Sequence, residues 1–311
     1  MIAHGGRLAA ARRRWPAAPA PFLDLSTGIN PHPWPIPALP DAAFARLPEP
    51  EEVAALEAAA AHAYGVADPA MVAAAPGTQA LIQLLPRLFP AAQVAVVGPT
   101  YAEHAHAWRQ SGAEIAAGAA TLVLCNPNNP DGRVRPAAEV LALPARRLIV
   151  DEAFADFAAD GVSLAPHLPR PGVIVLRSFG KAYGLAGVRL GFALAAAEEA
   201  AAIRAALGPW AVSGPAIAIG CAALADSAWR EAMGRQLAAE AASLDACLTA
   251  GGLRVRGGTT LFRLADSRRD DLADDLGRAG ILVRAFADRP GTLRFGLPAT
   301  PDGLARLAAA L

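Results

Sequence analysis

The sequence predicts an α/β protein built around a mostly parallel sheet, because short apolar strands alternate with helical stretches and end at polar residues. The apolar spacing indicates helices in Glu51–Tyr64 and Ala80–Phe89. Strands are expected at Gln93–Val97, Leu122–Cys125, Leu148–Val150 and Val173–Arg177. Ligands of such sheets bind beyond the carboxyl ends of the strands, so the polar residues found there are candidate site residues.

The chain divides into three predicted segments. Residues 1–45 are rich in Pro and Gly and form an arm, and residues 46–212 form a large domain that carries the sheet. Residues 213–311 form a smaller C-terminal α+β domain. In this domain a long helical stretch, Ala216–Ala250, precedes short strands near Arg254–Val255, Thr260–Leu264, Ile281–Arg284 and Leu293–Leu297.

Composition excludes several classes of protein. The 28 basic and 28 acidic side chains cancel, so neither nucleic acid nor an anionic membrane surface is an expected partner. No uncharged apolar run is long enough to span a bilayer. The basic cluster Arg12–Arg14 is followed by Trp15-Pro16 instead of an apolar run, so a solvated arm is favoured over a targeting signal. The scattered cysteines Cys125, Cys221 and Cys247 favour a reducing, cytoplasmic setting without a metal or disulfide framework.

Lysine occurs once in the chain, at Lys181, whereas arginine occurs 27 times. Arginine replaces lysine at most surface positions, but its guanidinium stays protonated and cannot form a Schiff base. A single retained lysine is therefore a candidate for chemistry that requires an amine. Taken alone, Lys181 could equally be a chance survivor.

The segment around Lys181 is glycine-rich and follows an apolar strand. Ser178 lies three residues before the lysine and Arg189 eight residues after it. A hydroxyl and a guanidinium are good partners for a dianionic phosphate, and an adjacent amine could hold an aldehyde. The same segment could also be a flexible surface loop.

Two further polar positions follow predicted strands. Asp151 ends the strand Leu148–Val150, where a buried acid needs a cationic partner such as a protonated pyridine nitrogen. A helix N-cap is the plainer reading of this aspartate. Asn129 lies in the turn Asn126-Pro127-Asn128-Asn129-Pro130 and could donate to a phenolate oxygen, although a turn alone would explain the segment.

Two more segments could contact a planar phosphorylated ligand. Gly77, Thr78 and Gln79 precede a helix, and backbone amides at a helix N-terminus bind phosphate. Tyr101 follows a strand and could stack on a ring, or could simply be a packed core residue.

Taken in order, these segments resemble the aminotransferase superfamily of pyridoxal-phosphate (PLP) enzymes of fold type I, over nearly the whole chain. The resemblance implies that Lys181 holds the cofactor as a Schiff base and moves protons, and that Asp151 pairs with the pyridine nitrogen. It also implies that Asn129 donates to the ring oxygen and that Tyr101 stacks on the ring. The cofactor phosphate would be held by Ser178, Arg189 and the segment Gly77-Thr78-Gln79. Arg294, in Leu293-Arg-Phe-Gly-Leu297, matches the arginine that binds the substrate carboxylate.

Two positions depart from the superfamily pattern. Phe154 stands where many members have a tyrosine that donates to the ring oxygen. Leu47, in Arg46-Leu47-Pro48, replaces a tyrosine that reaches the partner subunit's cofactor phosphate in many members. Cofactor affinity or ring electronics is therefore expected to differ.

The N-terminal arm is similar to that of the threonine-phosphate decarboxylase family of cobalamin biosynthesis. The residues that carry this resemblance are His4-Gly5-Gly6 and Leu23–Pro31, and Phe154 also matches that family. The resemblance implies a lyase that decarboxylates L-threonine O-3-phosphate to (R)-1-amino-2-propanol O-2-phosphate. It places Arg284 near the substrate phosphate, with Asn30, Gly5 and Gly6 completing the substrate site. Arg284 could instead be a surface arginine, and Asn30 a turn residue.

Two alternatives to the decarboxylase remain open from the sequence. One is an aminotransferase, such as histidinol-phosphate aminotransferase. The other is a non-catalytic protein with the same fold, although the presence of Lys181, Asp151 and Arg189 argues against it. Members of the superfamily are generally homodimers, so a homodimer is expected.

Overall fold

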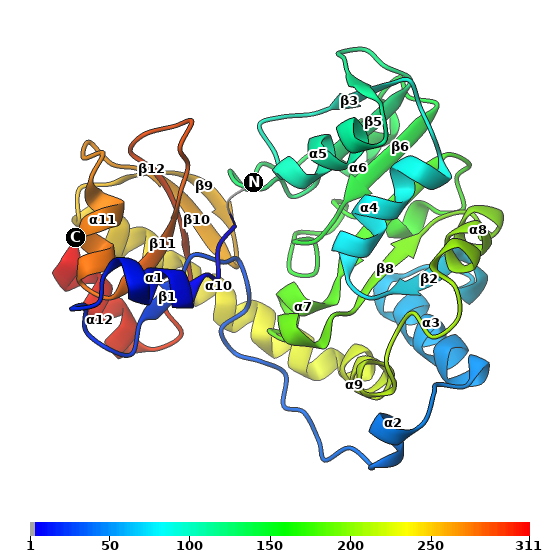
Figure 1. Cartoon of the computed structure of the whole chain (residues 1–311), viewed down its shortest axis with the longest axis horizontal. Coiled ribbons are helices and arrows are strands. Elements are labelled where there is room, and N and C mark those ends of the chain that lie inside the picture. The colour runs from blue at the N-terminus through cyan, green and yellow to red at the C-terminus, as the bar shows by residue number, and fades with distance from the viewer. Residues whose placement is uncertain (1–3) are drawn as a thin grey trace. The chain divides into compact units, whose positions relative to one another are not determined.

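The computed structural model describes residues 4–311, which group into two compact units (Figure 1). Unit 1 contains the chain up to His32, the short segment Pro130–Arg133, and Ala232–Leu311. Unit 2 contains Pro33–Asn129 and Val134–Glu231. The chain therefore begins and ends in unit 1, and unit 2 lies between these two parts of the sequence.

A seven-stranded sheet forms the centre of unit 2. Its strand order is β2-β8-β7-β6-β5-β3-β4, and β8 is antiparallel to both of its neighbours whereas the pairs from β7 to β4 are parallel. The predicted mostly parallel sheet is thus confirmed. The strands are β2 (Val72–Ala75), β3 (Gln93–Val96), β4 (Glu114–Ile115), β5 (Thr121–Cys125), β6 (Arg147–Asp151), β7 (Val173–Ser178) and β8 (Gly191–Leu194).

The carboxyl ends of β5 and β6 are level, and β7 extends two residues beyond them. Cys125 pairs with Asp151, and Asp151 pairs with Leu176. The amide of Asn126 donates to the carbonyl of Asp151, and the amide of Glu152 donates to the carbonyl of Leu176, both at 2.9 Å. The polar residues that follow these three strands therefore emerge along one edge of the sheet.

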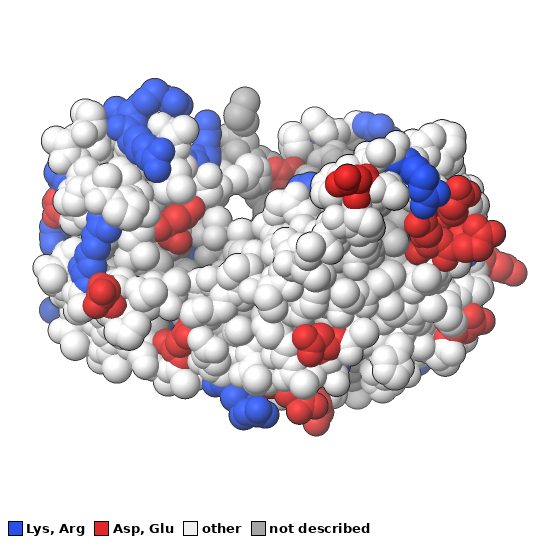
Figure 2. All heavy atoms as spheres, turned by 90° about the horizontal axis from the view of Figure 1, so that it is seen from below, with Lys and Arg blue, Asp and Glu red and all other residues white. Residues whose placement is uncertain are grey.

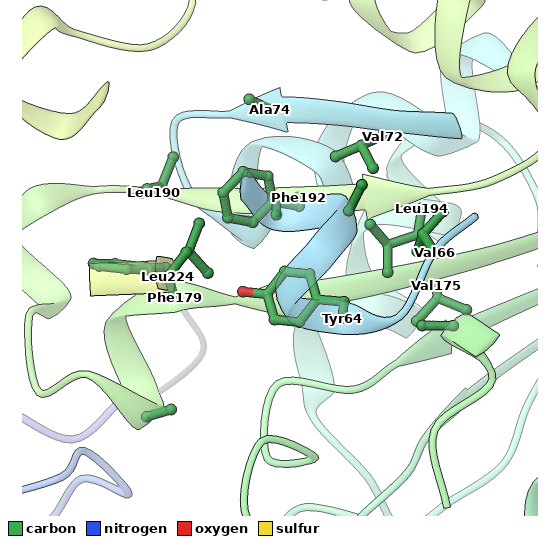
Figure 3. Close-up of a cluster of buried hydrophobic side chains, with 14 of the residues drawn as sticks. Tyr64, Val66, Val72, Ala74, Val175, Phe179, Leu190, Phe192, Leu194 and Leu224 are labelled. Atoms are coloured by element: carbon green, nitrogen blue, oxygen red, sulfur yellow. The ribbon is translucent and has the colours of Figure 1, made fainter. Parts of the chain in front are cut away.

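Helices cover both faces of this sheet, so alternate residues of each strand enter two separate cores. One core contains Val72, Ala74, Val175 and Phe192 together with residues of α3, including Tyr64 (Figure 3). The other contains the alternate strand residues with side chains of α4, α5 and α8. The helices of unit 2 are α2 (Ala42–Ala45), α3 (Pro50–Tyr64), α4 (Thr78–Leu88), α5 (Ala102–Gln110), α6 (Ala137–Leu141), α7 (Phe179–Ala182), α8 (Ala197–Leu207) and α9 (Gly214–Ala225), with short 3-10 turns at Pro69–Met71, Ala165–His167 and Ala186–Val188.

Unit 1 is built on a five-stranded sheet of order β1-β11-β12-β10-β9. The pair β1–β11 is parallel, and the other pairs are antiparallel. Its strands are β1 (Leu23–Leu25), β9 (Arg254–Thr259), β10 (Phe262–Asp266), β11 (Ile281–Ala285) and β12 (Thr292–Gly296). Its helices are α1 (Leu8–Arg14), α10 (Ser227–Ala250, which begins in unit 2), α11 (Leu272–Arg278) and α12 (Pro301–Ala310).

The prediction of one helical stretch over Ala216–Ala250 was wrong. Two helices, α9 and α10, occupy this range, and they are separated at Asp226. The Asp226 carboxylate accepts a hydrogen bond from the amide of Trp229 at 3.0 Å and another from the indole of Trp34 at 3.1 Å. A capping aspartate that is also held by a distant tryptophan starts a new helix, although both flanking sequences favour helix. Residues 8–14 and 23–25, which lack a clear period, nevertheless form α1 and β1.

Charge is unevenly divided between the two units. Unit 1 has sixteen arginines and eleven acidic residues, whereas unit 2 has twelve basic and seventeen acidic residues. On the face shown in Figure 2, the middle of the surface is mostly uncharged, with acidic side chains gathered at its right edge and basic ones at its upper left. Within residues 4–311, none of the helices combines the length and the apolar character needed to cross a membrane.

A buried ion pair joins the ends of β6 and β7. The Arg177 guanidinium lies 3.1 Å from a Glu152 oxygen and 3.0 Å from an Asp156 oxygen, and it stacks 4.4 Å from the centre of the Tyr64 ring. Glu152 also accepts hydrogen bonds from the Ser163 hydroxyl and the Leu164 amide. Burial raises the pKa of Glu152, although Arg177 and these hydrogen bonds oppose the shift.

We expect Arg177→Met to lower the free energy of unfolding by about 3–5 kcal/mol, because it leaves the Glu152 and Asp156 carboxylates buried without their cation. Urea denaturation would measure the loss. Arg147→Met is the matched control, since Arg147 pairs with Glu199 at a more exposed position and should cost about 1 kcal/mol. Equal losses of unfolding free energy in the two variants would show that the buried ion pair contributes no more than the more exposed one.

Candidate active site

Three segments of unit 2 converge on the first turn of α4. Gly77 precedes this helix with a left-handed φ of 86°. A Cβ atom on Gly77 would lie 2.7 Å from the Arg189 guanidinium, and a Cβ on Gly191 would lie 2.7 Å from the Thr78 amide. The first amides of a helix have no acceptor within the helix. The space between the first amides of α4 and the Arg189 guanidinium, called the phosphate cradle below, therefore combines backbone donors with a guanidinium. It fits a phosphate group.

Lys181 lies in a short loop that is closed by strand pairing. Ser178, the last residue of β7, pairs with Gly191, the first residue of β8. Lys181 follows in α7, and Arg189 precedes Gly191 with a left-handed φ of 59°. The pairing therefore brings the amine-bearing turn and the phosphate-binding candidates together.

Aromatic packing holds the same loop in place. The Tyr183 ring stacks between Phe179 and Trp229, with centroid distances of 4.4 and 5.5 Å. Phe179 and Tyr183 are fully buried. The Lys181 segment is therefore a packed turn, not a flexible surface loop.

Asp151 forms a buried hydrogen bond with His104, which the sequence reasoning missed. His104 Nε2 lies 2.8 Å from an Asp151 oxygen, and 2% of the His104 side chain is exposed. Burial lowers the pKa of His104, but Cys125 and the hydrogen bond to Asp151 outweigh that effect and raise it. The hydrogen bond from His104 fixes the orientation of the buried Asp151 carboxylate.

The only signal for His104 in the sequence is its position three residues after Tyr101. This spacing places His104 on the inner face of α5, where the two rings meet edge to face at a centroid distance of 6.0 Å. The donor atoms of His104, Cys125 and Asp151 lie within 4.8 Å of one another.

Tyr101 is the N-cap residue just before α5, and Gln79 accepts a hydrogen bond from its hydroxyl. The Tyr101 hydroxyl donates to the Gln79 side-chain oxygen at 3.2 Å, and the Gln79 amide donates to Glu103 at 3.1 Å. Burial, assisted by Glu103 and Asp151, raises the pKa of Tyr101 to about 12, so the phenol remains neutral. These two hydrogen bonds fix the orientation of the half-buried Tyr101 ring, which could stack on a planar ligand.

Asn129 lies in a turn that its neighbours pin at several points. The Asn126 side-chain oxygen accepts from the Arg135 backbone amide, and the Asn128 side-chain amide donates to the Pro99 carbonyl at 3.0 Å. The Thr100 hydroxyl donates to the Asn128 side-chain oxygen at 2.7 Å. The segment is a turn, as the simpler interpretation held, and its rigidity presents Asn129 in one position.

The two departures from the family pattern have different surroundings. Phe154 is buried, and its ring centre lies 5.8 Å from the Lys181 amine. It therefore contributes an apolar wall beside the amine. Leu47 is 61% exposed.

The predicted substrate arginines are cross-strand partners in unit 1. Arg284 of β11 pairs directly with Arg294 of β12. Arg294 is 8% exposed, donates to the carbonyl of Ser26 at 3.0 Å and lies 5.1 Å from the centre of the Phe262 ring. Two cations directly opposite each other repel, so the pair is well suited to anionic groups.

Ser26 also joins the N-terminal arm to this arginine pair. Its hydroxyl accepts a hydrogen bond from the Gly6 amide at 2.7 Å, and a side chain on Gly5 would collide with its carbonyl. Asn30 is buried and accepts from the His32 amide at 2.9 Å, which is the geometry of a turn residue. The candidate substrate residues thus gather in unit 1, and the candidate cofactor residues gather in unit 2.

A phosphate cradle, a lone amine and a buried carboxylate within one unit are the parts that a PLP enzyme needs. A sequence model described as aminotransferase class I and II matches residues 21–121 and 114–311. The chain belongs to this aminotransferase family.

Three members of the aminotransferase family illustrate its range. A threonine-phosphate decarboxylase from Pseudomonas aeruginosa is 46% identical, over 100% of this chain and 97% of the relative. A second one, from a Sinorhizobium species, is 42% identical with the same coverage. The crystal structure of histidinol-phosphate aminotransferase from Sinorhizobium meliloti, in complex with pyridoxal-5'-phosphate, aligns with a TM-score of 0.87 at 25% identity, covering 100% of this chain and 94% of that one.

We expect Gly77→Ala to weaken the binding of pyridoxal phosphate at least about tenfold, because its methyl group would occupy the space next to the Arg189 guanidinium. Absorbance titration of the apoprotein with the cofactor would measure the dissociation constant. Gly118→Ala is the control, since Gly118 has a similar φ of 75° but no atoms within 4 Å of the position that its methyl group would take. Both variants should lose about 1 kcal/mol of stability from backbone strain. Unchanged affinity in Gly77→Ala would argue against the cradle.

Proposed function

We propose that this chain is a PLP-dependent carboxy-lyase that converts L-threonine O-3-phosphate to CO2 and (R)-1-amino-2-propanol O-2-phosphate, a precursor of the cobalamin nucleotide-loop linker. The observation that carries the choice of substrate is the likeness over full length to two threonine-phosphate decarboxylases at 46% and 42% identity. The paired arginines Arg284 and Arg294 support an amino acid with a second anionic group.

The residues of unit 2 fit the cofactor. The amine of Lys181 would carry its aldehyde, and Asp151, oriented by His104, would face its ring nitrogen. Asn129 would donate to the ring oxygen, and Tyr101 would lie against the ring. Ser178, Arg189 and the amides at the start of α4 would hold the phosphate. The chemistry that pyridoxal phosphate supplies when bound is an electron sink for the bond that breaks at Cα.

The chain's own residues would select and orient the substrate. Arg294 would bind the carboxylate, and Arg284, beside it on the neighbouring strand, would bind the phosphate. Asn30 and the amides of Gly5 and Gly6 would complete the substrate contacts. The buried Phe154 ring would keep water away from the amine of Lys181. After CO2 has left, the protonated amine of Lys181 would return a proton to Cα.

An aminotransferase acting on histidinol phosphate is the second candidate, and it rests on the likeness to the Sinorhizobium meliloti enzyme at 25% identity. Both reactions use the same cofactor residues. They differ in which bond at Cα breaks. Only the aminotransferase needs a keto acid to accept the amino group, so the requirement for a second substrate separates the two.

We expect the protein, incubated with pyridoxal phosphate and L-threonine O-3-phosphate without a keto acid, to release CO2 and aminopropanol phosphate in equal amounts. Lys181→Ala should abolish both products, because it removes the only lysine. Lys181→Arg should also be inactive, since it keeps the charge but not a reactive amine. Turnover of histidinol phosphate with 2-oxoglutarate, without CO2 release, would exclude the decarboxylase and support the aminotransferase.

We also propose that the protein acts as a homodimer through unit 2. Ile36, Phe44, Leu47 and Trp210 are exposed there, by 48, 69, 61 and 57%. The face viewed from below Figure 1, where α2 and α9 lie, carries few charges (Figure 2). Exposed aromatic side chains are typical of the core of a protein–protein interface, and the charged residues Arg46, Glu49 and Glu52 beside Leu47 would belong to its polar rim.

Phe44→Glu should shift the protein from dimer to monomer in sedimentation velocity, because it would bury a carboxylate in the interface. Ala117→Glu is the control, since Ala117 is exposed beyond β4, at the opposite edge of the sheet from β2. A dimer of unchanged affinity in Phe44→Glu, or a monomeric wild-type protein, would exclude this interface.

The same proposal includes a cytoplasmic location. Its support is the presence of three free cysteines, Cys125, Cys221 and Cys247, in the described chain. Unpaired thiols are typical of reducing compartments. Recovery of the protein from a periplasmic or extracellular fraction would contradict this location.

A further inference from the structure

We infer that Arg289, in the β11–β12 hairpin, is a second arginine that binds the substrate phosphate together with Arg284. This inference rests on the proposed function and extends its substrate site. It assigns a specific role to a residue that no motif in the sequence marks.

The aromatic ring of Phe286 links the two arginines. The Arg284 guanidinium carbon lies 5.2 Å from the centre of this ring, and that of Arg289 lies 4.6 Å from it. Both guanidinium groups therefore pack against the same side chain at this end of the hairpin. Stacking on an aromatic ring restricts each guanidinium, so less conformational freedom is lost when an anion binds.

The Arg289 side chain has an unused donor. Its Nε atom is buried and has no hydrogen-bond partner within the described residues. This Nε atom lies 3.4 Å from Oδ2 of Asp288, whose side chain is 74% exposed, but the contact does not form a hydrogen bond. A buried donor without an acceptor is costly, and a phosphate oxygen would satisfy it.

Charge matching favours two arginines on the phosphate. A phosphate monoester is close to dianionic at neutral pH, so a single guanidinium neutralises only part of its charge. Arg294 already donates to the Ser26 carbonyl and suits the singly charged carboxylate. Arg284 is half-buried, and burial lowers its pKa although Asp288 opposes the shift, so an anion beside it would compensate for lost hydration.

The order of cations along the hairpin matches the order of charges in the substrate. Arg294 and Arg284 are directly opposite on β12 and β11, and Phe286 connects Arg284 to Arg289 at the hairpin tip. The surplus of five positive charges in unit 1 adds a field that favours the same anionic substrate.

The test compares Arg289→Gln with Arg268→Gln in the PLP-loaded protein. Arg268 is exposed in the same unit, so its substitution removes an equal charge and controls for the long-range field. Three quantities would be measured: KM and kcat for L-threonine O-3-phosphate, the inhibition constant of inorganic phosphate, and the inhibition constant of unphosphorylated L-threonine.

For Arg289→Gln we expect KM and the phosphate inhibition constant to rise about tenfold or more, with kcat within about twofold of wild type. The inhibition constant of L-threonine should not change, because L-threonine lacks the phosphate. Phe286→Leu should raise KM for the phosphorylated substrate in the same direction, since it removes the ring that holds both guanidinium groups. Arg268→Gln should resemble the wild type.

Two results would overturn the inference while the proposed function stands. One is an active Arg289→Gln protein whose KM and phosphate inhibition match those of Arg268→Gln. The other is an equal loss of affinity for L-threonine and its phosphate, which would indicate general damage to the hairpin. A wild-type protein that releases no CO2 would refute the proposed function, and the inference would fail with it.

Discussion

The register of β5, β6 and β7 is the constraint on which the site of unit 2 depends. Cys125, Asp151 and Leu176 pair across three parallel strands, so Asn129, Asp151 and Lys181 all follow the same edge of the sheet. Parallel pairing at this edge requires helices on both faces, which the two separate cores provide. A slip of one residue in β6 would turn Asp151 away from His104 and towards the opposite core.

Alternation along β6 and β7 assigns neighbouring residues to different tasks. Asp151 faces α5 and His104, whereas Glu152 faces the opposite core and meets Arg177. Arg177 stacks on Tyr64, and the next residue, Ser178, pairs with Gly191 at the phosphate cradle. Each member of the stabilising ion pair is therefore adjacent in sequence to a residue of the candidate site. Glu152 follows Asp151, and Arg177 precedes Ser178.

Features encoded locally could be predicted from the sequence. The strands ending at Cys125, Asp151 and Ser178 each carry an apolar run and a polar stop, so their positions were correct to within one or two residues. His104 was missed because its role depends on how α5 packs against β6. Strand β1 was missed because three residues carry no period and its partner β11 lies more than 250 residues further along the chain. The break at Asp226 depends on Trp34, which is also remote, 192 residues earlier in the sequence.

The pairing of β1 with β11 makes unit 1 depend on both ends of the chain. During synthesis on the ribosome, Pro33–Glu231 emerges almost entirely as unit 2, whereas the N-terminal arm must wait for Ala232–Leu311. At about 5–20 residues per second, these last 80 residues take roughly 4–16 s to be made. In that interval the nascent chain can complete the sheet that carries Lys181 while Leu23–Leu25 has no strand to pair with. The order of translation therefore favours completion of the unit that contains Lys181 before Arg284 and Arg294 have been made.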